Sequence, residues 1–347
     1  MLLFFLRKTC HREIIMRILL LANFLFLASF ELLANTTLKV QTFNAYGPIY
    51  ARHLESRTKG LLEAIEKDPS DIYLFQEVWE KDHQETLANK LSKGHPFSGA
   101  FGMNKEFSRD GLFAFGKGKV LSHKVFNYPL NQDGLLDKVR GFFGVVKAVS
   151  LTRVKLEGIG NVLLVNTHTH PLSSKIRVAQ MVFLAKKVLE HKEPKDALIV
   201  AGDFNFTPFS LPYRLLVAVL GLEDAFLQVQ GAYGAHCTYC EGNTYGWGGP
   251  SRVIDYIFYQ KTSGLKLLSA QINLKRGPKG PLSDHFGVTA TLKLDEKREH
   301  SHSLAQARKV IFEAKEALEA FGEQKGESAA LLAALDTVKG WLSSYHP

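Results

Sequence analysis

Short apolar segments alternate with helical patterns from Thr37 to about Leu294. Eight of these segments are rich in Val, Ile, Leu and Phe, as strands are. They cover residues 38–43, 72–75, 112–115, 142–150, 162–166, 197–201, 253–259 and 287–292. Helical patterns cover residues 57–67, 84–91 and 176–191. Several predicted strands end in polar clusters, where an α/β sheet usually carries its site. The pattern therefore predicts an α/β domain with a functional site at the strand ends.

The composition changes after Asp295. Residues 303–321 and 328–343 are rich in Ala, Glu, Lys and Leu, which is typical of helices. Gly322, Gly326 and the polar residues between them separate the two segments, so we expect a helical hairpin. Neither helix has a basic polar face, which favours packing against the domain or a partner helix over insertion into a membrane.

The N-terminus has the pattern of a signal peptide. Arg17 precedes an apolar run over residues 18–30, which is shorter than the roughly 20 residues needed to span a bilayer. We expect a leader over residues 1–34 with cleavage after Ala34, and Met16 is an alternative start. An uncleaved anchor is the other interpretation. Both place the body of the protein outside the cytosol, so the sequence predicts a secreted or extracytoplasmic protein.

Composition and charge narrow the class of protein only slightly. Hydrophobic residues make up 46% of the chain and charged residues 22%, which favours a globular fold over disorder. The formal net charge of +9 attracts anionic bilayers and nucleic acid alike. Cys237 and Cys240 are too few for a structural zinc site, which needs four ligands. A local disulfide or two ordinary thiols is expected instead.

Six polar clusters lie at the ends of predicted strands. They contain Asn44, Glu77, His168 with His170, Asp203 with Asn205, Asp255, and Asp284 with His285. Each cluster alone is a weak signal, but together they supply carboxylates for a hard cation and imidazoles for proton transfer or phosphate contact. Glu77 with Asn44 suits Mg²⁺, and Asp284 supports that region; Mn²⁺ and Co²⁺ are alternatives. Asp255 lies within a predicted strand, where a carboxylate is costly unless it holds a partner such as His285.

The ordered motifs N, QEVW, NTH, GDFN, IDY and SDH resemble those of the endonuclease/exonuclease/phosphatase superfamily of metal-dependent phosphoesterases. This resemblance covers residues 38–292 and implies a two-sheet αβ-sandwich. The segments FNAYGPIY, EVW, GLFAFGK, THTH and GPLSDH are similar to those of the neutral sphingomyelinases. The resemblance implies a phosphodiesterase domain at residues 35–295, with a C-terminal helical extension at 296–347. It also implies a Mg²⁺-dependent enzyme that hydrolyses sphingomyelin to ceramide and phosphocholine.

The resemblance also implies roles for the clustered residues. His285, oriented by Asp255, takes a proton from the attacking water, and Asp203 and Asn205 position that water and the phosphoryl group. His168 donates to a phosphate oxygen, and His170 does the same or fixes its loop. Arg140, in place of a lysine common in the family, is expected to contact substrate.

A lipid substrate also requires peripheral contact with the membrane, for which apolar side chains near the site are candidates. They are Phe206, Phe209, Leu211, Tyr213, Tyr245 and Trp247, and Phe206 and Trp247 are also expected to bind the substrate. Packing of these rings in the core is the alternative.

Three other functions remain open at this point. A secreted metal-dependent nuclease would reuse the same catalytic residues, and contacts with phosphates would explain the basic charge. If the protein is a sphingomyelinase, no nucleic-acid partner is expected. A phosphoinositide phosphatase is less favoured because no dense Lys/Arg cluster lies beside the motifs. A degenerate membrane- or partner-binding protein would not need the complete catalytic set. No obligate protein partner is expected.

Overall fold

The computed structural model describes residues 36–48, 51–92, 110–131, 146–294, 304–325 and 328–344. The chain divides into two compact units, residues 1–37 and 38–347. The predicted leader at residues 1–34 and Arg140 lie outside the described residues, so both expectations stay predictions.

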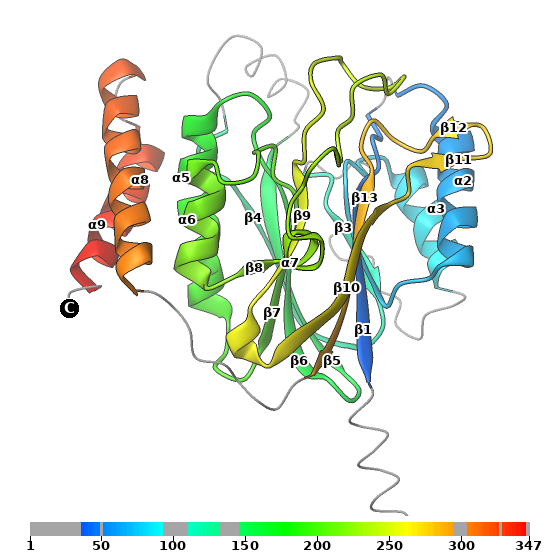
Figure 1. The fold of residues 1–347 in the computed structure, drawn as a ribbon, viewed down its shortest axis with the longest axis horizontal. Coiled ribbons are helices and arrows are strands. Elements are labelled where there is room, and N and C mark those ends of the chain that lie inside the picture. Colours follow the sequence, from blue (N-terminus) through cyan, green and yellow to red (C-terminus); the bar gives the residue numbers. More distant parts are fainter. Residues whose placement is uncertain are drawn as a thin grey trace, which may run out of the picture. The chain divides into compact units, whose positions relative to one another are not determined.

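Two β-sheets form the centre of the domain (Figure 1). The five-stranded sheet has the order β10 (Leu265–Asn273), β13 (Gly287–Leu294), β1 (Thr37–Asn44), β2 (Ile72–Gln76) and β3 (Phe113–Gly116). The six-stranded sheet has the order β4 (Lys119–Asn127), β5 (Ala148–Leu156), β6 (Gly160–His168), β7 (Ala197–Asp203), β9 (Asp255–Tyr259) and β8 (Glu223–Asp224). A separate two-stranded ribbon joins β11 (Arg276–Gly277) to β12 (Gly280–Pro281). The predicted two-sheet αβ-sandwich is confirmed.

Helices cover the outer faces of both sheets (Figure 1). α2 (Leu54–Lys67) and α3 (Lys81–Leu91) pack on the five-stranded sheet, with Leu61 and Leu87 in one cluster with Phe75. α5 (Ser174–His191) and α6 (Leu211–Leu220) pack on the six-stranded sheet. The short helices α7 (Ala225–Gln230) and η1 (Lys261–Ser263) flank β9 in the chain. The space between the sheets forms a third core, which contains Val40 and Ile199.

The predicted C-terminal hairpin is present as α8 (Leu304–Lys325) and α9 (Ala329–Ser344). Ile311, Leu318 and Leu335 join the same apolar cluster as α5 and α6, so the hairpin extends the core of the domain. Arg214 on α6 donates to Glu313 on α8 at 2.7 Å. Within the described part of the chain, no helix combines the length and the apolar character needed to cross a membrane.

The alternation of side chains along the strands decides which residues face the other sheet. In β1, Leu38 and Val40 face the space between the sheets, whereas Phe43 faces α2 and α3. In β7, Ile199 and Ala201 face the space between the sheets, and their neighbours face α5 and α6. Successive side chains point to opposite faces of a strand. A polar residue at a strand end therefore points to the opposite sheet when it lies an even number of residues from those that face the space between the sheets.

Candidate active site

Three polar residues form one row across the six-stranded sheet. His168 ends β6, Asp203 ends β7 and Asp255 begins β9, and the strand register pairs His168 with Asp203 and Asp203 with Asp255. The side chain of each residue is on the face of its strand that faces the five-stranded sheet. In that sheet Asn44 ends β1, and its side chain is on the face toward the six-stranded sheet. The Asn44 Nδ2 donates to Asp203 Oδ2 at 3.0 Å across the gap between the sheets. The strand pattern therefore brings four of the predicted residues together at one end of the inter-sheet core.

The close approach of β6 and β7 at this row requires a glycine. Gly202 has a φ of +145°, and a Cβ there would lie 2.0 Å from the Thr167 carbonyl oxygen. Below the row, a polar layer joins the two sheets, with Gln76 Nε2 donating to Asn166 Oδ1 at 2.8 Å. Asn166 Nδ2 in turn donates to the Phe75 carbonyl. These buried bonds fix the separation of the sheets directly under the site.

The carboxylate of Asp203 lies at the centre of the cluster. Its Oδ2 is 3.3 Å from His168 Nε2 and 3.8 Å from His285 Nε2, and its Oδ1 accepts the backbone N–H of Asn205 at 3.0 Å. Burial acts to raise the pKa of Asp203, but the charges of His285, His168 and Lys147 hold it well below its usual range. Asp203 is therefore a fixed negative charge at this position.

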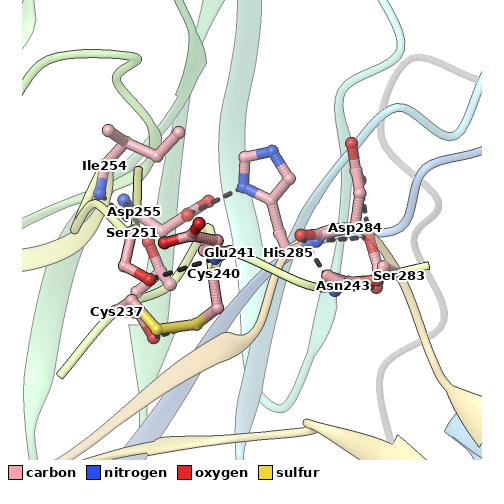
Figure 2. Close-up of a disulfide and its surroundings, with 11 residues drawn as sticks. Cys237, Cys240, Glu241, Asn243, Ser251, Ile254, Asp255, Ser283, Asp284 and His285 are labelled. Carbon is pink, nitrogen blue, oxygen red and sulfur yellow. Dashed lines mark hydrogen bonds and ion pairs between the residues drawn. A yellow bond between two sulfur atoms is a disulfide. The ribbon is translucent and has the colours of Figure 1, made fainter. Parts of the chain in front are cut away.

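His285 and Asp255 form a buried hydrogen-bonded pair. The Nδ1 of His285 lies 2.8 Å from Asp255 Oδ2 (Figure 2). The other ring nitrogen, Nε2, lies 3.8 Å from Asp203 Oδ2. Burial alone would lower the pKa of His285, but the charges of Asp255, Asp203 and Asp284 raise it well above its usual value. This geometry is that of a base oriented by a carboxylate, as the sequence predicted.

Glu77 and Asp284 add two more carboxylates to the cluster. Glu77 follows β2, has a φ of +59° and places Oε1 3.7 Å from His168 Nε2. Burial raises the pKa of Asp284 to about 7, and the charges of Glu77 and Asp203 act in the same direction. The φ of Glu77 lies in the left-handed region, which is uncommon for a residue with a side chain and costs about 1–3 kcal/mol. Such a backbone conformation is retained where a site needs it.

This concentration of carboxylates fits a divalent cation. Asp203, Asp255 and His285 present ligand-type atoms within 4.8 Å of one another. Two of these three already bind each other, because Asp255 accepts from His285. The side chain of Glu77 is 17% exposed, and its Oε1 lies 3.7 Å from His168 Nε2, which also contacts the Asp203 oxygen that Asn44 binds. Oxygen donors of this kind suit Mg²⁺ and similar hard cations, so the residues present fit a bound divalent cation.

His170 and Asn205 hold the loops around the site. The Nδ1 of His170 accepts the backbone N–H groups of Leu172 and Ser173 at 3.2 and 3.0 Å. Of the two roles predicted for His170, these bonds support the one that fixes its loop. Asn205 has a φ of +51°, and its Nδ2 donates to the Thr169 carbonyl at 3.1 Å. That bond holds the loop after β7 against the loop after β6.

The predicted contact of Phe206 and Tyr213 with substrate or bilayer is wrong. Phe206 is 2% exposed and Tyr213 5% exposed, and both pack against Tyr256. The reason is α6, an amphipathic helix that buries the ring of Tyr213 in the core. Trp247 and Phe209, by contrast, are 77% and 61% exposed and stay candidates for such contact.

Two basic residues that sequence patterns did not indicate also belong to the site. Lys147 precedes β5, and its Nζ lies 2.6 Å from His168 Nε2. Arg57 on α2 is buried and donates to the carbonyls of Ala45, Tyr46 and Leu282, so it ties the loop after β1 to the segment before Asp284. Both residues come from elements without a polar motif, so only tertiary contacts reveal them.

The comparisons with known proteins agree with this geometry. The model of the Endonuclease/Exonuclease/phosphatase family matches residues 42–285. Sphingomyelin phosphodiesterase 2 of Homo sapiens is 27% identical over 281 residues, which cover 74% of this chain and 64% of the human protein. Inositol phosphosphingolipids phospholipase C of Schizosaccharomyces pombe is 28% identical over 201 residues, which cover 55% of this chain and 46% of the yeast protein. The chain thus spans less than two thirds of either relative.

A solved structure shows the same fold. The beta toxin of Staphylococcus aureus, in a mutant form with bound magnesium ions, superposes with a TM-score of 0.59. It is 17% identical, and the match covers 75% of this chain and 100% of the toxin chain. At this identity the likeness concerns the fold alone.

Proposed function

The chain belongs to the Endonuclease/Exonuclease/phosphatase family, since that family's model matches residues 42–285, and on this premise we propose that it is a phosphoric diester hydrolase acting on sphingolipids. The observation that carries the proposal is the Asp255–His285 pair. The Nε2 of His285 lies 3.8 Å from the Asp203 carboxylate, whose Oδ2 also contacts His168 and accepts from Asn44. We infer that a base, a cation and the substrate phosphate would meet at this point, as hydrolysis of a phosphodiester requires.

Glu77 and Asn44 would hold the divalent cation, with Asp284 in support. When bound, the cation supplies positive charge that stabilises the charge developing on a nonbridging phosphate oxygen. The proposed ion is Mg²⁺, because the donors are oxygens and the similarly folded beta toxin holds magnesium. Mn²⁺ and Co²⁺ are the alternatives.

The chain's own residues move the proton and hold the phosphoryl group. Nε2 of His285 accepts a proton from the attacking water, and the imidazolium that forms is stabilised by Asp255. Asp203 and the loop of Asn205 position the water, while His168 and Lys147 bring donors to the phosphate oxygens. The water oxygen bonds to phosphorus, and the bond to the ceramide oxygen breaks. The products are ceramide, with a proton on that oxygen, and phosphocholine.

Sphingomyelin is the proposed substrate, because the human relative is a sphingomyelin phosphodiesterase. The yeast relative is named for inositol phosphosphingolipids, so a sphingolipid with an inositol phosphate headgroup is the second candidate. Both substrates are cleaved at the same phosphodiester. Export by the predicted leader would place the enzyme at a membrane surface, where the exposed side chains of Trp247 and Phe209 would contact lipid.

The test measures headgroup release by the full chain from three substrates in parallel. These are sphingomyelin liposomes, liposomes of an inositol phosphosphingolipid, and plasmid DNA, each with Mg²⁺ and then with EDTA. Phosphocholine released only with the metal supports the proposal. Headgroup release from the inositol phosphosphingolipid alone would make that lipid, rather than sphingomyelin, the substrate. Nicked DNA with intact liposomes would replace the lipid substrate with nucleic acid.

A further inference from the structure

A four-residue disulfide ring lies beside the catalytic pair (Figure 2). Cys237 and Cys240, in the connection between α7 and β9, form a disulfide with their Cα atoms 5.3 Å apart, which confirms one of the two expectations for these cysteines. The ring encloses Thr238 and Tyr239, which are buried, while the two cysteines are half-buried. The disulfide is therefore open to a small reductant, although the residues that it encloses are not exposed.

Thr238 contacts the backbone on both sides of the pair. Its Oγ1 accepts the N–H groups of Ile254 and Asp255 at 3.0 and 3.2 Å. Its carbonyl accepts the N–H of Phe286, the residue after His285, at 2.6 Å. One threonine thus holds the chain at Asp255 and at His285.

Tyr239 makes a second link of the same kind. Its backbone pairs with Arg252 on one side and with His285 on the other. Its ring meets the His285 imidazole edge-on, with the centroids 5.3 Å apart and the planes at 71°. The Tyr239 hydroxyl accepts the backbone N–H of Trp247 at 2.6 Å. The tyrosine therefore limits how the imidazole can rotate and also anchors the loop that carries the exposed Trp247.

We propose that Thr238 and Tyr239, constrained by the Cys237–Cys240 disulfide, are positioning residues for the Asp255–His285 pair. This inference rests on the proposed function. Neither residue touches the reacting atoms; both fix the distance between Asp255 and His285. The disulfide reduces the conformational freedom of residues 237–240, which bond to the start of β9 and to the residues before β13. Reduction by a dithiol adds two electrons and two protons, gives two thiols and lowers turnover as the pair loses its alignment.

The first test replaces the hydroxyl that binds Asp255. Thr238→Val is expected to lower kcat about 10- to 100-fold, the usual cost of losing a partner that orients a site residue, with KM nearly unchanged. Thr238→Ser keeps the hydroxyl and should restore most of kcat. Thr152→Val is the matched control, because that buried hydroxyl bonds to His123 on β4, away from the pair. Equal loss in Thr152→Val, or no rescue by Thr238→Ser, would overturn the role of Thr238.

The second test addresses the disulfide in the wild-type chain. Treatment with dithiothreitol, with thiol titration to show that the disulfide has opened, should lower kcat about tenfold or more, since small misplacement of catalytic groups has effects of that size. The Cys237→Ser/Cys240→Ser variant should show the reduced kcat from the start and be insensitive to dithiothreitol. A fully reduced wild-type chain with unchanged kcat would refute the role of the disulfide.

A spectroscopic readout separates this inference from the proposed function. The His285 N–H bonded to Asp255 should give a downfield proton resonance in the oxidised chain. That resonance should broaden or shift upfield in Thr238→Val and on reduction, and remain in Thr152→Val. If no lipid is hydrolysed but the resonance responds in this way, the proposed substrate fails and the positioning role stands. If the resonance does not respond, the positioning role fails, whatever the substrate.

Discussion

Replacing Asp255 by Asn changes one oxygen in a buried hydrogen bond of the site. The carboxylate now accepts from His285 Nδ1 at 2.8 Å, and both groups are buried. An asparagine can present its amide N–H₂ to Nδ1 instead, which moves the ring proton to Nε2. In that tautomer Nε2 donates and can no longer accept a proton from water. The substitution preserves the shape of the residue and removes the base.

Two contributions set the size of the effect. A hydrogen bond to a charged group contributes about 1.5–3 kcal/mol, which corresponds to a factor of roughly 10 to 150 in rate. The wrong tautomer adds to this, and a comparable substitution in a serine protease triad lowers kcat about 10⁴-fold. We therefore expect Asp255→Asn to lower kcat by about 10³ to 10⁴, with little change in KM. The assay is initial-rate phosphocholine release over a range of sphingomyelin concentrations.

Asp224→Asn provides the matched control. Asp224 is also buried, in β8 next to β9, but it accepts from Tyr213 and Tyr233 rather than from a histidine. It should lose some stability and keep kcat within about threefold, an expectation that follows from its distance from the reacting groups. If Asp255→Asn keeps kcat within tenfold of the wild type, or if both variants lose the same factor, the reasoning about tautomers is wrong.

Three further predictions concern stability and metal binding. Gly202→Ala should lower the free energy of unfolding by about 3 kcal/mol or more, because its Cβ would lie 2.0 Å from the Thr167 carbonyl oxygen; an unchanged urea midpoint would contradict this. Burial raises the pKa of Asp284 to about 7, so without metal this residue contributes stability that is present below about pH 4 and lost as the pH rises through 7. Asp284→Asn should therefore reduce the fall in the free energy of unfolding between pH 4 and 8, measured by urea denaturation in EDTA, by up to about 4 kcal/mol. A pH dependence equal to that of the wild type would exclude Asp284 as its cause. Mg²⁺ should raise the melting temperature of the wild type but not that of Glu77→Gln, and an equal rise in both would remove Glu77 from the metal site.

The sequence predicted the strands that build the site because their pattern is strong. β2, β6, β7 and β9 are buried on both faces and therefore appear as apolar runs next to polar motifs, whereas β1 alternates apolar residues with Lys39 and Gln41. The polar side chains of those motifs lie at strand ends, on the strand faces that point to the opposite sheet. The strand order therefore brings these side chains together.

Among the longer elements, the strands β4 and β10 and the helix α6 were missed for a physical reason. β4 and β10 lie at sheet edges with largely exposed side chains, so Lys, Ser and Gln replace the apolar signal. α6 begins with Pro212 in its first turn and was interpreted as an aromatic loop. That error placed Tyr213 at the membrane. Lys147 and Arg57 were missed because each acts through neighbours that are distant in the sequence.

The strand order places β13 directly beside β1, which makes the last strand of the domain a neighbour of the first. His285 lies just before β13, so the base joins the other polar groups only when the end of the domain has been made and docked. A chain still emerging from the ribosome carries Asn44, Glu77, His168 and Asp203 but has no proton acceptor. The strand order thus implies that the proposed hydrolysis begins only after synthesis of the domain is complete.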